Sequence, residues 1–318
     1  MELRILKYKY LCFLACIFFL ACEKDVTIDL PKGEPRLVVE GRIETGAAPL
    51  VILSKSTGFF SSTDAAAFEQ SLVNDAEVFV QTGQQEVKLG TLCSDNPLIA
   101  PFLPQVSASL GVPLELLQRI RFCIYTDLTG SMTGKENTQY KLRINWASKT
   151  YSATTTIPPH IPLDSCYFRE SRSKPGLGVM RATLRDPETP GNYYRWYARR
   201  ITRDQRFLRP MGSVFEDRFF NGETFWFEVT RPVAINSTEP EDIGREKYLY
   251  KNTDTVIVKF CTIDKGAFEF LRTFESEAAN LGNPFAAPIT VVSNIDNGAT
   301  GVWAGYGVWT DTVYCNKP

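Results

Sequence analysis

The first 21 residues constrain the rest of the chain most, because they predict the compartment in which it folds. Three basic residues precede an apolar run over residues 10–21, and Cys22 follows a small residue. This is the layout of a secretory signal that ends in a lipidated cysteine. The apolar run has roughly a dozen residues, whereas a transmembrane helix needs about 20. We therefore predict that residues 1–21 are a lipoprotein signal peptide and that the remainder folds after export.

Two cysteines in this segment fit the local pattern of a lipidation site, because both Cys16 and Cys22 follow alanine. Processing at Cys16 would leave residues 17–20 as an exposed apolar tail, which lowers solubility. Charged residues follow Cys22 at once. We predict that Cys22 carries the covalent lipid, such as palmitate, and that the proline- and glycine-containing residues 22–35 form a tether.

The charge of the mature chain argues against one class of partner. The full sequence has 35 Lys+Arg and 36 Asp+Glu, and the leader removes three basic residues and one acidic residue, which leaves a net charge of −3. So weak a charge gives no electrostatic footprint for nucleic acid or for an anionic membrane surface. We expect the acyl chain to hold the protein at the lipid bilayer, and we expect no nucleic-acid partner.

Five cysteines remain besides the lipidated one, namely Cys93, Cys123, Cys166, Cys261 and Cys315. In an exported protein these are disulfide candidates, and their odd number leaves at least one unpaired. Cys93 and Cys123 are the preferred pair because they bracket one insertion-like segment; closing this loop is worth about 3 kcal/mol. Cys166 with Cys315 is a second candidate pair. No metal site is expected, since the thiols lack zinc-ligand spacing and His160 is the only histidine.

Period-two alternation predicts a mainly β fold. Residues 36–43 and 50–54 form a predicted hairpin, further strands follow at 76–81 and 85–89, and residues 140–146 alternate most clearly. A strand that opens with tyrosine is similar to the tyrosine corner of immunoglobulin-like folds. We predict an N-terminal immunoglobulin-like β-sandwich domain over residues 36–158, with a short helical insertion that begins at Pro113.

Prolines at 158, 159 and 162 interrupt strand pairing, so we place a domain boundary there. Residues 159–318 are predicted to form a second β-sandwich or barrel-like domain. It contains one helix near residues 265–281, which Asp264 caps. Asn221-Gly222 predicts a hairpin between residues 217–220 and 223–227.

No stretch of the chain groups residues into a catalytic constellation, so we predict no catalytic residues. A nucleophile needs a base near pH 7, and His160 lies in the proline-rich segment. The chain does, however, contain several clusters of aromatic residues. Trp226, Trp303 and Tyr306 are candidates for a binding surface for a sugar or peptide, because amphipathic rings are favoured at contact surfaces. Alternatively, the same aromatic side chains pack in the hydrophobic core.

Several motifs occur in an order that resembles a known family. They are Cys22-Glu23-Lys24-Asp25, residues 28–31, 37–41, 123–127, 140–142, 282–288 and 293–298, and Gly305-Tyr306-Gly307. Together they cover nearly the whole mature chain. They resemble the Bacteroidota lipoprotein family named domain of unknown function 4249.

The resemblance implies a location more than an activity. Members look like outer-membrane lipoproteins that accompany TonB-dependent transporters, and they supply no catalytic residues to transfer. Glu23 and Asp25 resemble a surface-export signal in that lineage. We therefore expect a lipid-anchored outer-membrane protein that faces the cell exterior and acts as a non-enzymatic binding or accessory subunit. Its small-molecule, glycan or peptide ligand is unspecified, and no cofactor is expected besides the lipid.

Two other functions remain open from the sequence. A surface hydrolase for glycans or peptides would place an acid pair about 5–10 Å apart in an open aromatic cleft. A structural, adhesin-like module would instead expose long edge strands without a pocket.

Overall fold

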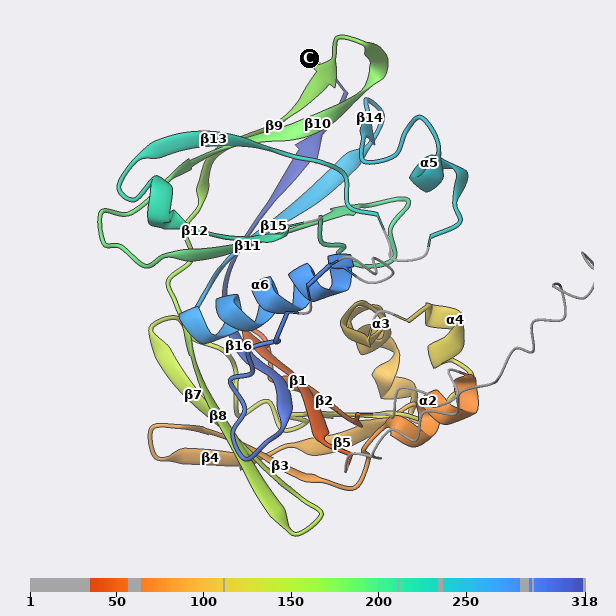
Figure 1. The fold of residues 1–318 in the computed structure, drawn as a ribbon, viewed down its shortest axis with the longest axis vertical. Coiled ribbons are helices and arrows are strands. Elements are labelled where there is room, and N and C mark those ends of the chain that lie inside the picture. Colours follow the sequence, from red (N-terminus) through yellow and green to blue (C-terminus); the bar gives the residue numbers. More distant parts are fainter. Residues whose placement is uncertain are drawn as a thin grey trace, which may run out of the picture. The chain divides into compact units, whose positions relative to one another are not determined.

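Strands from both ends of the described chain form a central eight-stranded sheet (Figure 1). The computed structural model describes residues 35–56, 64–110, 112–210, 212–233, 237–280, 286–287 and 289–316. Cys22, Cys16 and the tether up to residue 34 lie outside these residues. In sheet order the strands are β12 (Val214–Glu216), β11 (Tyr193–Arg200), β15 (Thr255–Ile263), β16 (Thr300–Tyr314), β1 (Leu37–Glu44), β2 (Leu50–Lys55), β6 (Cys123–Thr126) and β5 (Gly90–Cys93). Because β1 pairs in parallel with β16, the first and last strands are neighbours.

Two smaller sheets complete two β-sandwiches with this central sheet. The N-terminal sheet has the order β4 (Gln85–Lys88), β3 (Glu77–Thr82), β7 (Thr138–Trp146) and β8 (Lys149–Ile157). The C-terminal sheet consists of β13 (Thr224–Val229), β10 (Lys174–Arg185) and β14 (Tyr250–Lys251), with β9 (Leu163–Ser171) also paired to β10. The predicted mainly β, sandwich-type fold is therefore confirmed.

Both small sheets pack on the same face of the central sheet. Trp303 of β16 belongs to the apolar core beneath the N-terminal sheet, and Trp309 packs against the core beneath the C-terminal sheet. These two residues are six positions apart on one strand, so their side chains point to the same face. One long strand thus contributes to both sandwich cores.

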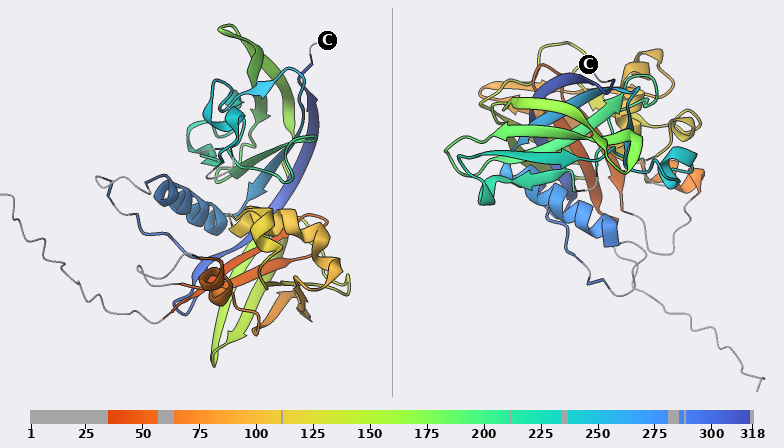
Figure 2. Two further views of the ribbon diagram at one scale, coloured as in Figure 1. Left: turned by 90° about the vertical axis from the view of Figure 1, so that its right-hand side faces the viewer. Right: turned by 90° about the horizontal axis from the view of Figure 1, so that it is seen from above.

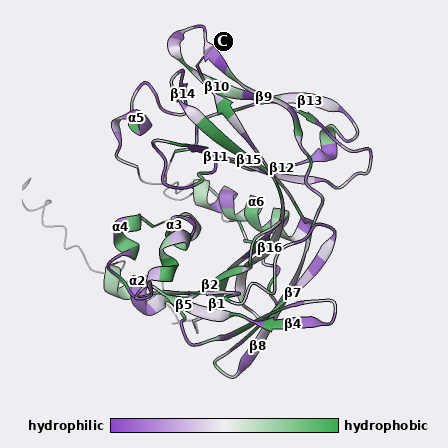
Figure 3. Ribbon diagram, turned by 180° about the vertical axis from the view of Figure 1, so that it is seen from behind, coloured by the Kyte–Doolittle hydropathy of each residue, from purple (hydrophilic) through white to green (hydrophobic). Residues whose placement is uncertain are grey.

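Helices cover parts of the opposite face (Figure 2). They are α2 (Ala65–Ser71), η1 (Pro97–Phe102), α3 (Leu103–Leu110), α4 (Leu114–Leu117) and α6 (Lys265–Asn280); the short η2 (Asp217–Phe219) and α5 (Pro240–Ile243) lie elsewhere in the chain. Leu271 of α6 packs in a cluster with Ala304, whereas Val106 and Leu117 of α3 and α4 pack with Ile52 of β2. Figure 3 shows hydrophobic and hydrophilic residues alternating around α6, as one buried side requires.

A charged band lies on this helix-bearing face. The strict burial alternation of β1 turns Val39 and Ile43 toward the N-terminal sheet and turns Glu40, Arg42 and Glu44 the other way. Following the strand register to β15 and β11 puts further polar residues on the same face. We define the charged band as Glu40, Arg42, Glu44, Arg195, Tyr197, Arg199 and Lys259.

Residues 35–318 form one compact unit, so the predicted boundary near residue 158 falls inside it. The apolar cores nevertheless change there: one core draws mainly on residues 37–157, and another draws on residues 163–315. The central sheet takes strands from both sides of this position. The connection therefore joins two sandwiches that share one sheet.

Local predictions from sequence had mixed outcomes. The predicted helix is α6, and Asp264 caps it by accepting a hydrogen bond from the Ala267 amide at 2.8 Å. The Asn221-Gly222 hairpin prediction was wrong, because Asp217–Phe219 is a 3₁₀ turn and β13 pairs with β10 instead. In the part of the chain that the structure describes, no helix is long and apolar enough to cross a membrane.

Candidate binding surface

The predicted cysteine pair lies at one edge of the central sheet. Cys93 of β5 and Cys123 of β6 are directly opposite in the strand register and are joined by a disulfide bond. The bond closes the segment that contains η1, α3 and α4. Cys166, Cys261 and Cys315 are free thiols, so the second candidate pairing is not formed.

The three candidate aromatics have different environments. Trp303 is fully buried and its indole Nε1 donates to the Tyr140 carbonyl oxygen at 3.0 Å. Tyr306 is buried under α6, and its hydroxyl accepts a hydrogen bond from Arg195 Nη1 at 3.0 Å. Trp226 is 57% exposed. Of the three, therefore, only Trp226 is placed to contact a partner directly.

Trp226 is exposed because β13 alternates. Phe225 and Phe227 turn into the core beneath the C-terminal sheet, so the residue between them must face outward. On the neighbouring strand β10, the Arg181 guanidinium carbon lies 3.8 Å from the centre of the Trp226 ring. A guanidinium stacked on an indole in this way is a favourable cation–π contact.

A second aromatic residue continues this surface. Arg181 lies opposite Tyr167 of β9 in the register, and Tyr167 is 47% exposed. We call Trp226, Arg181 and Tyr167 the aromatic row. Sequence reasoning missed Arg181 and Tyr167, because only the pairing of β9, β10 and β13 brings them beside Trp226.

Ion pairs border the aromatic row. Arg169 of β9 pairs with Glu228 of β13 across β10, and Arg185 pairs with Asp164 at 3.2 Å. The surface therefore offers ring faces and a planar cation at its centre with salt-bridged polar groups around them. Such a composition suits stacking and hydrogen bonding with a partner, because Trp, Tyr and Arg combine large contact area with polar edges.

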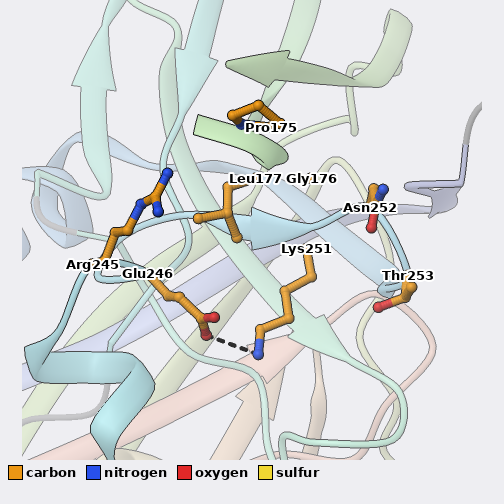
Figure 4. Close-up of a pocket in the computed structure, with 8 residues that line it drawn as sticks. All are labelled: Pro175, Gly176, Leu177, Arg245, Glu246, Lys251, Asn252 and Thr253. Carbon is orange, nitrogen blue, oxygen red and sulfur yellow. Dashed lines mark ion pairs between the residues drawn. The ribbon is translucent and has the colours of Figure 1, made fainter. Parts of the chain in front are cut away.

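An open pocket of about 340 Å³ lies at the start of β10, between the β9–β10 turn and β14. Its lining consists of Pro175, Gly176, Leu177, Arg245, Glu246, Lys251, Asn252 and Thr253 (Figure 4). Lys251 and Glu246 form an ion pair at 2.8 Å across it. These two charges neutralise each other, and Arg245 adds a further cationic residue to the lining.

His160 and two buried carboxylates, Asp217 and Asp186, are engaged in structural contacts. His160 Nδ1 lies 2.6 Å from Glu136 Oε1. Buried Asp217 accepts hydrogen bonds from the Gly191 and Asn192 amides, both at 2.8 Å, and buried Asp186 accepts from the Tyr194 hydroxyl. Among the described residues, no group of three or more His, Cys, Asp or Glu side chains is arranged to hold a metal ion.

Comparison with family models gives one match. A model described as domain of unknown function (DUF4249) matches residues 23–312. Comparison with curated proteins gives no match. The family match begins directly after Cys22 and extends into β16, so it includes the whole N-terminal sheet and the whole C-terminal sheet.

Proposed function

The chain belongs to the DUF4249 family, and from this membership we propose that it is an outer-membrane lipoprotein, anchored through Cys22 and facing the cell exterior. In this proposal it is a non-enzymatic accessory subunit of a TonB-dependent transport system. The signal layout before Cys22 and the acidic residues Glu23 and Asp25 support the location.

The aromatic row is the observation that carries the accessory role. Trp226 and Tyr167 leave large ring surfaces in water, on a sheet whose other face already has a complete core. Trp, Tyr and Arg are the residues most enriched among those that dominate binding energy at protein interfaces. Arg181 holds the Trp226 ring in place by stacking, which lowers the conformational entropy lost on binding. The row is therefore the surface that contacts the transporter.

The buried carboxylates form structural hydrogen bonds, and this favours a binding role over hydrolysis. Asp217 has two backbone amides as donors, and Asp186 accepts from the Gly222 amide at 3.0 Å as well as from Tyr194. These acids hold the turns around β11, and general acid–base catalysis would require a carboxylate that faces substrate.

Purification from native membranes in mild detergent tests the proposal. The tagged full chain should bring down a TonB-dependent transporter, and Trp226→Ala should lower the recovered transporter at least tenfold. Phe219→Ala is the matched control, because Phe219 is an 89% exposed aromatic residue outside the row. Isolation of the wild-type chain without a transporter would refute the accessory role. Equal recovery with Trp226→Ala and Phe219→Ala would refute the assignment of the contact surface.

A further inference from the structure

The charged band contains four cations, Arg42, Arg195, Arg199 and Lys259, and two acids, Glu40 and Glu44. Glu44 serves two cations, with Lys259 Nζ at 2.6 Å and Arg42 Nη1 at 3.9 Å. Burial raises the pKa of Glu44, but the charges of Lys259 and Arg42 outweigh that effect and hold it below its ordinary value. Glu44 is therefore an anion in the folded protein, and it is paired with two cations of the band.

A second acid at the edge of the band is shared in the same way. Glu275 of α6 lies 3.4 Å from Arg195 and 3.3 Å from Arg209, measured between nitrogen and oxygen. It also accepts hydrogen bonds from the amide and hydroxyl of Ser213. Each of these two acids thus lies between two cations.

Two further arginines have no acid partner among the described residues. Arg199 of β11 has its guanidinium carbon 5.4 Å from the centre of the Phe207 ring. Arg206, which precedes Phe207, donates to the Ser107 hydroxyl and to the Val112 carbonyl oxygen at 3.3 Å. Burial lowers the pKa of Arg206, and no carboxylate acts in the opposite direction. Both side chains are partly buried and have no counter-charge among the described residues, which is unfavourable.

Unpartnered donors occur at the same place. The Nε groups of Arg195 and Arg199 are buried, and neither has a hydrogen-bond acceptor in the described part of the chain. Arg195 as a whole is only 7% exposed. A buried N–H group without an acceptor is costly, so native structures normally supply one.

Helix α3 contacts two arginines of this region. Arg42 donates to the Gln105 carbonyl oxygen of α3 at 3.4 Å, and Arg206 reaches Ser107 on the same helix. The helical insertion that the disulfide closes therefore borders the band on one side. Lys259 adds another positive charge near Phe207, because its Nζ lies 5.6 Å from the centre of that ring.

From this arrangement we propose that the charged band binds an oxyanion, either a carboxylate or a phosphate group, at Arg199 and Arg206 beside Phe207. A guanidinium presents a planar fork of donors that matches both kinds of oxyanion. The bound anion supplies the missing counter-charge at the Arg199 and Arg206 guanidinium groups. Lys259 and Arg195 add positive potential around it. This site is independent of the aromatic row and of the membrane anchor.

Binding of two defined probes to the mature protein tests the inference. Inorganic phosphate and citrate are each titrated at constant ionic strength, with chloride as the balancing ion, and binding is measured by calorimetry and by the rise in Tm. At least one probe should bind saturably. Arg199→Gln and Arg206→Gln should each weaken that binding at least tenfold. Arg185→Gln is the matched control, because its side chain is 73% exposed on the C-terminal sheet.

The outcomes distinguish a phosphoryl ligand from a carboxylate ligand, and they also test the inference itself. Binding of phosphate alone identifies a phosphoryl ligand, and binding of citrate alone identifies a carboxylate ligand. If Arg199→Gln does not fold, Arg199→Lys and Arg206→Gln still report on the site, since the lysine keeps the charge and loses the bidentate fork. Absence of saturable binding by both probes would overturn the inference. Equal affinity in Arg206→Gln and Arg185→Gln would overturn it as well.

Discussion

The carbonyl oxygen of Pro158 lies directly over Gly307 of β16: a Cβ atom at Gly307 would be only 2.2 Å from it. The connection between the two small sheets crosses the central sheet at this point. Thr262 of β15 holds it there, because its hydroxyl donates to the Pro159 carbonyl oxygen at 2.7 Å. Gly305 makes room in the same way, with the Thr156 carbonyl 2.8 Å from its hypothetical Cβ. Tyr306, between the two glycines, faces Arg195 on the other side.

Gly307→Ala should therefore destabilise the protein by about 3 kcal/mol, at the upper end of overpacking effects. The backbone of the crossing connection cannot move away without breaking its bond to Thr262. Urea unfolding measures the change. Gly266→Ala is the control, because a Cβ there meets its nearest atom at 3.4 Å, in the first turn of α6; it should be neutral or stabilising. Equal stability of Gly307→Ala and wild type would contradict the crossing geometry.

Tyr140→Phe should cost about 1–3 kcal/mol, because it removes a buried corner contact. The Tyr140 hydroxyl donates to the Thr133 carbonyl oxygen at 3.0 Å and accepts from the Lys135 amide at 2.8 Å. This is a tyrosine corner, with the hydroxyl bonded to backbone a few residues upstream. Tyr167→Phe, on the exposed face, should change the unfolding free energy by less than about 0.5 kcal/mol. Equal effects of the two substitutions would count against the corner.

The fold was most predictable where the pattern of buried and exposed residues lies within a single strand. The alternation from residue 140 to 146 correctly predicted that Tyr140, Leu142 and Ile144 face a core, because period-two burial is a local property. The helix after Asp264 was predictable for the same reason. The parallel pairing of β1 with β16 was not, since it joins residues that are more than 250 positions apart.

The candidate surface was predictable only in part. Trp226, Trp303 and Tyr306 are equivalent in sequence terms, and only the sandwich decides that Trp226 faces solvent. Arg181 lies beside it only through the strand register, and Arg199 lies near Phe207 only through the loop after β11. The Asn221-Gly222 prediction failed because Asp217 turns inward to accept two backbone hydrogen bonds, which stops the preceding segment from pairing with β13.

Loss of the disulfide should destabilise the protein by about 3 kcal/mol, since the bond closes a loop of sequence separation 30. Cys93→Ser and Cys123→Ser should each lower the unfolding free energy by this amount. A reductant should have the same effect on the wild type and no further effect on either variant. A reductant-induced loss of similar size in Cys93→Ser would show that another bond is responsible.

Lys259→Met should destabilise the protein in a pH-dependent way. The pKa of Glu44 lies below its ordinary value, so its ion pairs stabilise the folded state above about pH 4.3 and this contribution disappears as the pH falls through the lowered pKa. Removing Lys259 leaves Glu44 buried with its weaker partner Arg42. We expect a loss of about 3 kcal/mol at pH 7 and a smaller loss at pH 3. Guanidinium unfolding at both pH values measures it, and equal losses would contradict the assignment.

Lipid labelling tests the central claim, anchoring through Cys22, most directly. Cells that express the full chain are grown with a labelled fatty acid, and the label on the purified protein is measured for the wild type, Cys22→Ala and Cys16→Ala. We predict that Cys22→Ala abolishes labelling and that Cys16→Ala leaves it at the wild-type level. Labelling that survives Cys22→Ala, or that is lost in Cys16→Ala, would contradict the anchor.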